Sequence, residues 1–480
     1  MSRGLGWSLG SSVVLRVGNL LLSIVIARLV APEAYGVFAV ALTVWTVVSA
    51  LSEFGLGSDV VRSRDPERRA PTVATLGAGL GLLAAAVMAL AAPFVAEAFR
   101  SPGSTRVLVV MALAPALFGL TIVPAAFLQR AYRQRTLFVV NGAALLASAV
   151  TIVWLTLLDV GPVALAWGQV ASQATLVLGL HVAARRPPRF GFDRATAWDS
   201  LAFSSPLAVA NLVSWLLITL DNVIVSRELS PIVLGFYVLA FNVSSWPMSA
   251  VGQAVRVVAL PAFSDTDSAA QRNDGLVRSI GPVVLAAAFM GLGLATLASP
   301  VVAVLYGARW APASAALVGL AVFGATRVVL DLLATFLVAA GRTRDVLVVQ
   351  LVWLAAMVPV MVLSVREWGL AGAGWAHVVV VVVVVLPAYA FFLGRSGVDT
   401  VRLVGASIVP LAAVVPAAAA CWWIVSATAL SPWLTVLLGG TCATALYLGP
   451  LIPWFRNRLD ELRNPRPAAT HRRGRHHERS

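Results

Sequence analysis

The sequence contains no lysine, so all 35 of its basic residues are arginine. Charged residues make up only 12% of the chain, whereas a soluble domain carries about 25%. A chain of 480 residues with so few charges lacks the polar surface that a water-soluble protein needs. Because 59% of its residues are apolar, we identify it as an integral membrane protein.

Cysteine and histidine are also scarce. The two cysteines, Cys421 and Cys442, both lie in apolar segments, which argues against a disulfide framework. The five histidines form no cluster with metal-ligand spacing, so we expect no metal and no cofactor. The net charge of +14 does not indicate nucleic-acid binding, because the arginines lie between apolar segments rather than along one soluble face.

Long apolar stretches dominate the rest of the chain. A membrane-spanning helix needs about 20 mostly apolar residues, and the sequence offers fourteen such stretches. They are about 9–30, 35–56, 73–96, 107–128, 137–158, 162–183, 201–225, 233–255, 279–305, 312–339, 346–365, 370–393, 403–426 and 432–454. The first continues into Arg28 without a clear cleavage site, so we expect a retained helix rather than a signal peptide.

The distribution of arginine sets the predicted orientation. With the N-terminus in the cytoplasm, most arginines fall in cytoplasmic segments, as the positive-inside rule requires. The outer connections then hold only Arg28, Arg100, Arg106, Arg227, Arg309 and Arg366. A missing helix would invert this asymmetry, so we predict fourteen transmembrane helices with both termini in the cytoplasm.

Two sequence patterns occur twice. Arg, Pro, Gly, an aromatic residue and Ala recur at identical spacing in residues 28–41 and 227–240. Residues 161–170 and 369–378 share a second pattern, at nearly the same offset along the chain. We therefore predict an internal duplication. Its conserved spacing points to an architectural role, with each Pro opening a helix and each Gly permitting close helix approach.

The duplication predicts the organisation of an all-α fold with a 6+6+2 arrangement of helices. Both six-helix lobes begin on the cytoplasmic side, so they are parallel repeats about an axis along the membrane normal. The predicted parts are an N-lobe (1–183), a cytoplasmic linker (184–200), a C-lobe (201–394), two extra helices (395–455) and a basic, disordered cytoplasmic tail (456–480).

Ionisable and polar groups inside apolar stretches are candidate site residues, because an ionisable group costs about 2.5–3.5 kcal/mol at a helix centre. We predict substrate binding by Arg16, Asn19 and Arg327. Arg16 and Asn19 lie on one helical face, Arg327 comes from the opposite half, and a guanidinium matches phosphate oxygens. The alternative is that Arg327 merely neutralises Asp331 and that Arg16 caps backbone carbonyls or reaches the interface.

Three carboxylates are candidates for ion or proton coupling: Asp221, Asp331 and Glu53. For Asp221 we favour a structural role near outer water, where ionisation costs little. Glu53 falls near the inner end of its helix, and Arg327 would hold Asp331 ionised. His377 also titrates near neutrality, but a packing role is favoured for it.

These patterns resemble a known family. The fourteen helices in a 6+6+2 arrangement and Arg28-x3-Pro32-x3-Gly36 are similar to the polysaccharide exporter (O-antigen-type) branch of the multidrug/oligosaccharidyl-lipid/polysaccharide (MOP) flippase superfamily. So are Leu220-Asp221-Asn222, Gly235-x-Tyr237 and Val258-x-x-Pro261-x-Phe263-Ser.

The resemblance implies a transporter of the bacterial inner membrane and not an enzyme. Such proteins move a polyprenyl-pyrophosphate-linked oligosaccharide from the inner to the outer leaflet by alternating access, for surface polysaccharide such as lipopolysaccharide. Its expected partners are that lipid-linked glycan, membrane lipids and polysaccharide polymerase or assembly proteins.

Other functions stay open. A lipid II flippase of the same superfamily shares the fourteen-helix count, and a multidrug exporter usually has twelve. A membrane glycosyltransferase or polymerase is disfavoured, since every outer loop is short and Asp265-Thr-Asp267 has no catalytic domain around it.

Overall fold

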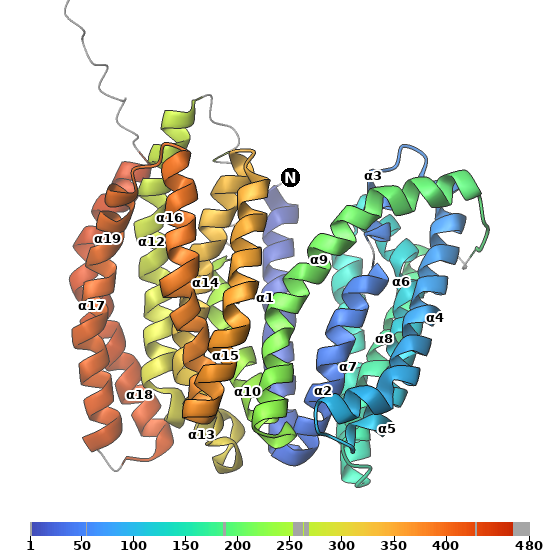
Figure 1. Ribbon diagram of the computed structural model, residues 1–480, viewed down its shortest axis with the longest axis horizontal. Coiled ribbons are helices and arrows are strands. Elements are labelled where there is room, and N and C mark those ends of the chain that lie inside the picture. Colours follow the sequence, from blue (N-terminus) through green and yellow to red (C-terminus); the bar gives the residue numbers. More distant parts are fainter. Residues whose placement is uncertain are drawn as a thin grey trace, which may run out of the picture. The chain divides into compact units, whose positions relative to one another are not determined.

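The computed structural model describes residues 2–53, 55–185, 189–252, 263, 268–427 and 430–463, in which every regular element is a helix (Figure 1). Within these ranges some side chains lie outside the described part of the structure, among them those of Arg16 and Glu53. Val258 and Pro261 of the family-like motif also lie outside it. The predicted all-α fold is confirmed.

The first half of the chain forms eight helices. They are α1 (Ser2–Leu29), α2 (Pro32–Glu53), α3 (Leu56–Arg62), α4 (Pro66–Ala98), α5 (Ser104–Met111), α6 (Leu113–Arg130), α7 (Gln134–Leu157) and α8 (Val163–Ala184). Local sequence fixes several starts. Asp65 caps α4 by accepting from the backbone N–H of Arg68 at 3.2 Å, and Pro66 follows at the first helical position.

The second half contains the remaining elements. They are α9 (Arg194–Glu228), α10 (Pro231–Ser244), η1 (Met248–Gly252), α12 (Ala269–Thr296), α13 (Ala298–Tyr306), η2 (Ala308–Trp310), α14 (Ala313–Ala339), α15 (Thr343–Val380), η3 (Val381–Val385), α16 (Leu386–Arg395), α17 (Thr400–Ala427), α18 (Pro432–Ala443), η4 (Thr444–Leu448) and α19 (Gly449–Arg463). Every predicted spanning stretch overlaps a helix. Helix α9 begins inside the predicted linker, because Asp193 caps it. Helix α19 extends past the expected start of the tail at 456, and residues 464–480 lie outside the described residues.

By length and composition, ten helices in the described part of the chain could cross a membrane. The chain is therefore a multi-pass membrane protein. One of these stretches, Thr343–Arg395, has 53 residues, which is far more than the roughly 20 that one crossing needs. The chain doubles back inside it at Gly369 (φ 56°, ψ −134°), since a Cβ on Gly372 would lie 1.8 Å from the carbonyl oxygen of Ser364. The predicted break between 365 and 370 is confirmed, while the count of fourteen spans stays a prediction.

The chain divides into two compact units. The first comprises residues 1–245, 298–323 and 347–385, and the second comprises 246–297, 324–346 and 386–480. A core of the first unit forms around Trp45, Met88 and Met111. In the second unit Tyr447 is fully buried and donates to the carbonyl oxygen of Leu285 at 3.2 Å. The predicted lobes follow other boundaries and stay a prediction.

The two copies of the first sequence pattern pack against each other inside the first unit. A Cβ on Gly36 of α2 would lie 2.2 Å from the carbonyl oxygen of Pro231, at the start of α10. A Cβ on Gly235 would lie 3.0 Å from the backbone nitrogen of Gly36 and 3.1 Å from the carbonyl oxygen of Pro32. Backbones approach this closely only where no side chain intervenes, so the glycine of each copy makes room for the other copy.

The second pattern marks two equivalent turns. Gly161 begins the copy before α8 with φ of 75°, and Gly369 begins the copy inside α15 with φ of 56°. Both values lie in the left-handed region, which glycine adopts without the steric cost of a Cβ. The repeated glycine therefore serves the same backbone purpose in both halves.

Candidate substrate cavity and buried polar cluster

A polar cavity of about 380 Å³ lies among α1, α2, α7 and α8 in the first unit. Its walls are largely apolar side chains such as Leu22 and Phe38. The polar groups that face it are two asparagines, a glutamine and three serines: Asn19, Asn141, Gln169, Ser23, Ser148 and Ser172. None of the described residues that line it is ionisable.

Two of the cavity's amides are held by their own helices. Asn19 donates through Nδ2 to the carbonyl oxygen of Leu15 at 2.9 Å, and Asn141 donates to that of Leu137 at 2.7 Å. Each amide carries a second N–H and a carbonyl oxygen beyond this bond. A wall of amides and hydroxyls between apolar side chains suits neutral, hydroxyl-rich molecules such as sugars.

Of the predicted substrate residues whose side chains the structure describes, Asn19 lines this cavity. The Arg16 side chain lies outside the described residues, although its backbone precedes Asn19 by one turn of α1. Arg327 is half-buried on α14 in the second unit, with Asp331 one turn further on. The substrate roles of these three residues therefore stay predictions. Sequence reasoning missed Asn141 and Gln169, although an amide inside an apolar stretch was a usable signal.

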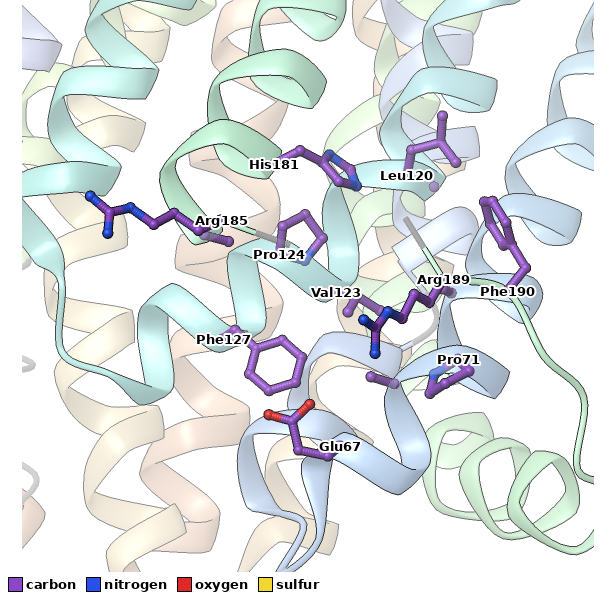
Figure 2. Close-up of a pocket in the computed structure, with 14 residues that line it drawn as sticks. Glu67, Pro71, Leu120, Val123, Pro124, Phe127, His181, Arg185, Arg189 and Phe190 are labelled. Carbon is purple, nitrogen blue, oxygen red and sulfur yellow. The ribbon is translucent and has the colours of Figure 1, made fainter. Parts of the chain in front are cut away.

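A second cavity, of about 420 Å³, lies at the ends of α4, α6 and α8 that are predicted to be cytoplasmic (Figure 2). Its polar lining includes His181 and Arg185 of α8 and its C-cap, Arg189 of the linker and Glu67 of α4. Phe127 and Phe190 are among its aromatic residues. The combination of arginine with apolar walls suits an amphipathic anion such as a lipid headgroup.

The linker is fastened to the N-terminal helices beside this cavity. The hydroxyl of Thr75 donates to the carbonyl oxygen of Gly191 at 2.8 Å, and the backbone N–H of Asp193 donates to Thr72 Oγ1 at 3.1 Å. The hydrogen bonds that Thr196 donates to Asp193 lower the pKa of that carboxyl. These bonds hold the start of α9 against α4.

A buried carboxylate strengthens the same attachment. Asp59 of α3 accepts both from Arg69 Nη1, at 3.1 Å to each oxygen, and from the hydroxyl of Ser200 on α9 at 2.7 Å. Helices α3, α4 and α9 therefore meet at one charge, and α9 lies far along the chain from the other two.

The opposite ends of the helices are joined by backbone-directed bonds. Arg28 of α1 donates to the carbonyl oxygens of Leu305 and Val304, the last turn of α13, at 3.0 and 2.5 Å. The fully buried Trp310 donates through Nε1 to the carbonyl oxygen of Ala27 at 2.6 Å. These contacts tie α1 to α13 and η2 at the end predicted to face outward.

Asp221 of α9 forms the centre of a buried polar cluster. Tyr237 of α10 donates to its Oδ2 at 2.5 Å, and the backbone N–H of Asn222 donates to its Oδ1 at 2.9 Å. Tyr237 Oη also lies 2.8 Å from Nε2 of His377 on α15, and that nitrogen is 3.4 Å from Asp221 Oδ2. The expectation that Asp221 lies close to water is wrong, since it is only 2% exposed.

The other coupling candidates are less defined. The side chain of Glu53 lies outside the described residues, and Asp331 is half-buried on α14. Their coupling roles, and that of Asp221, stay predictions. The sequence did not reveal that Tyr237 and His377 meet Asp221, because the three residues come from three separate helices.

The fold of this multi-pass helical chain is one that solved membrane transporters share. A solved structure of the lipid II flippase MurJ in an inward closed conformation matches it with a TM-score of 0.77, at 13% identity, covering 94% of this chain and 99% of that one. An inward-facing multidrug resistance MATE transporter of the MOP superfamily matches with a TM-score of 0.65, at 16% identity, covering 80% and 94%.

The sequence defines the family more narrowly. Residues 25–315 match the model of the family described as polysaccharide biosynthesis protein, and the chain belongs to this family. It is 23% identical over 351 residues to the lipopolysaccharide biosynthesis protein WzxC of Escherichia coli, covering 71% of this chain and 70% of that protein. It is 27% identical over 319 residues to the succinoglycan biosynthesis transport protein ExoT of Rhizobium meliloti, covering 65% of this chain and 63% of that protein. The family resemblance noted in the sequence is confirmed.

Proposed function

We propose that the protein is a flippase that moves a polyprenyl-pyrophosphate-linked oligosaccharide from the inner to the outer leaflet of a bacterial inner membrane. The transferred glycan serves surface polysaccharide biosynthesis. The protein acts by alternating access and carries out no chemical conversion of its substrate.

The observation that carries the proposal is the cavity among α1, α2, α7 and α8, whose described lining holds amides and hydroxyls but no ionisable group, in a chain of this family. Amides and hydroxyls can exchange hydrogen bonds with sugar hydroxyls as the glycan leaves water, and the leucine and phenylalanine walls can pack against sugar rings. The names of WzxC and ExoT, a lipopolysaccharide and a succinoglycan protein, support the same substrate class.

The carrier's phosphates need separate contacts. Arg16, whose backbone precedes Asn19 by one turn of α1, and Arg327 are the residues from which we expect these contacts. The cavity of Figure 2, with Arg189 and His181 in its lining, offers an anion a first contact at the cytoplasmic side.

We propose the predicted topology together with this function. It has fourteen helices in a 6+6+2 arrangement, with parallel lobes and both termini in the cytoplasm. The meeting of the two sequence repeats at Gly36 and Gly235 supports it. In that orientation an inside-negative potential favours outward movement of the anionic carrier by about 2.3 kcal/mol per charge per 100 mV.

The test is deletion of the gene in its natural host, followed by analysis of lipid-linked sugars and surface polysaccharide. We expect a polyprenyl-pyrophosphate-linked oligosaccharide to accumulate in the inner leaflet while the surface polysaccharide disappears. Unchanged lipid-linked sugars together with normal surface polysaccharide would refute the proposal.

A second candidate is a lipid II flippase. The match to MurJ over 94% of this chain favours it. Expression in a strain depleted of its lipid II flippase separates the two functions, since only a protein that moves lipid II restores growth.

A further inference from the structure

We propose that Asp221, Tyr237 and His377 form a proton-binding site whose occupancy changes during the transport cycle. The inference rests on the proposed transport function for its role, but not for its existence. Protons are the ligand, and the three side chains bind one proton as a unit.

With Asp221 as a carboxylate, the hydrogen bonds assign the remaining protons of the cluster. The hydroxyl proton of Tyr237 is used in the 2.5 Å bond to Asp221 Oδ2. In the 2.8 Å hydrogen bond between Tyr237 Oη and His377 Nε2, the histidine N–H is therefore the donor and the tyrosine oxygen the acceptor. In the neutral imidazole this leaves Nδ1 as an acceptor, and in the described part of the chain no donor reaches that buried nitrogen.

With Asp221 ionised and His377 neutral, the cluster is one proton short of neutrality. Asp221 and His377 are each 2% exposed, so a carboxylate charge beside a neutral imidazole has little water to stabilise it. A proton taken from water onto Nδ1 converts the imidazole to an imidazolium 3.4 Å from the carboxylate, and the pair becomes neutral overall. Because the groups are coupled, the proton belongs to the cluster rather than to one residue.

The immediate surroundings of the cluster are aromatic and neutral. The Phe323 ring of α14 stacks on the His377 imidazole, with 4.4 Å between the ring centroids, and the centroid of the Phe241 ring lies 6.1 Å from that of the imidazole. From α2, Thr43 contributes a hydroxyl. The charged residues elsewhere on these helices are Glu33 and Glu53 of α2, Arg194, Asp199, Arg227 and Glu228 of α9, Arg327 and Asp331 of α14, and Arg344, Asp345, Arg366 and Glu367 of α15.

Asn222 links the cluster to α2. Asn222 donates its backbone N–H to Asp221 Oδ1 and its side-chain Nδ2 to Thr43 Oγ1 at 3.0 Å. A proton on His377 compensates the negative charge to which the backbone N–H of Asn222 donates. The charge of the cluster therefore bears on the hydrogen bond that joins α9 to α2.

The first experiment measures the proton directly. The full chain, labelled with ¹⁵N-histidine and held in phospholipid nanodiscs, contains five histidines, and His377→Gln identifies the signal of His377. We expect this signal to change from the neutral to the doubly protonated form between about pH 8 and about pH 5. In Asp221→Asn the change disappears over that range, whereas Asp159→Asn, on an exposed turn, behaves like the wild type.

A His377 signal that stays neutral across the range, or that titrates identically in Asp221→Asn, overturns the proposal. The wild-type titration decides this even if Asp221→Asn fails to fold. Tyr237→Phe then tests the bridge, with the exposed Tyr132→Phe as its control: loss of the hydroxyl shifts the midpoint of the His377 titration, and an unshifted midpoint removes Tyr237 from the site.

A second experiment separates the proton site from the transport function. In vesicles with the membrane potential held at zero, the probe is a polyprenyl-pyrophosphate carrying a single sugar. For one proton per cycle, a gradient of one pH unit shifts the leaflet distribution by about tenfold, and Asp221→Asn abolishes the shift. Proton binding without movement of the probe would refute the proposed function alone, whereas movement that ignores the pH gradient would refute the coupling.

Discussion

The contact between Gly36 and Pro231 allows a sharp prediction about what holds α2 to α10. In Gly36→Ala the new Cβ would stand 2.2 Å from the carbonyl oxygen of Pro231. Carbon and oxygen atoms approach to about 3.3 Å at closest, so the helices must separate by about 1 Å. The atoms that the new Cβ would meet belong to the Pro231 backbone, so no flexible side chain can move aside to make room.

The cost follows from the packing. A gap of about 0.5–1 Å forfeits a quarter to a half of each dispersion contact across it, and overpacked cores lose about 1–3 kcal/mol. We expect Gly36→Ala to lower the free energy of unfolding by about 2–3 kcal/mol. Gly235→Ala should cost less, since its Cβ would meet Gly36 and Pro32 at 3.0–3.1 Å. Gly142→Ala on α7 is the control, with nothing within 4 Å of its Cβ, and should be neutral or stabilising because alanine favours helix.

The assay is thermal unfolding of the purified protein in detergent, followed by circular dichroism or by tryptophan fluorescence. The unfolding temperatures should fall in the order Gly142→Ala, Gly235→Ala, Gly36→Ala, with the last several degrees below the wild type. If Gly36→Ala unfolded at the same temperature as Gly142→Ala, the close approach of the two repeats would be wrong.

Three further predictions follow from single contacts. Trp310→Phe removes the donor to the Ala27 carbonyl and should lower stability by about 1–3 kcal/mol, measured by the same unfolding assay, while the exposed Trp433→Phe should have no effect. Asn19→Ala should slow transfer of a lipid-linked sugar in vesicles by about tenfold, the worth of one hydrogen bond. Thr175→Ala, which removes a hydroxyl that donates to Ala171 of the same helix, should transfer like the wild type. The hydrogen-bonded ion pair with Arg366 lowers the pKa of Glu228 below its ordinary value of 4.5. The ion pair therefore stabilises the folded protein above pH 4.5, and this stabilisation is lost as the pH falls through the lowered pKa. The difference in unfolding temperature between wild type and Glu228→Gln should therefore shrink from about pH 7 to about pH 3, and a constant difference would contradict the assignment.

Much of the fold could be predicted because the membrane restricts the choice of structure. Apolar stretches of spanning length must be helices, since an isolated strand in hydrocarbon leaves its backbone unsatisfied. The break near Gly369 was also predictable, because one 53-residue stretch cannot cross a bilayer once. The start of α9 inside the expected linker was missed, although the Asp193 cap was visible in the sequence.

The candidate site was predicted less well. Asn19 was found because it lies on the same helical face as Arg16. Its cavity partners on α7 and α8 were not, because sequence spacing carries no information on which helices are neighbours. Asp221 was assigned to water from its distance to the helix end, but lateral packing by α10 and α15 buries it.

The sequence by itself determined that this is a helical membrane protein of the polysaccharide biosynthesis family with a repeated Pro-x3-Gly element, because hydrophobic length and local spacing are properties of the chain alone. Only the tertiary structure decided that the two copies of that element meet, that Asp221, Tyr237 and His377 share one buried site, and that amides from three helices line one cavity. These contacts join residues far apart in sequence, and side-chain packing between helices, rather than any local preference, determines which of them come together.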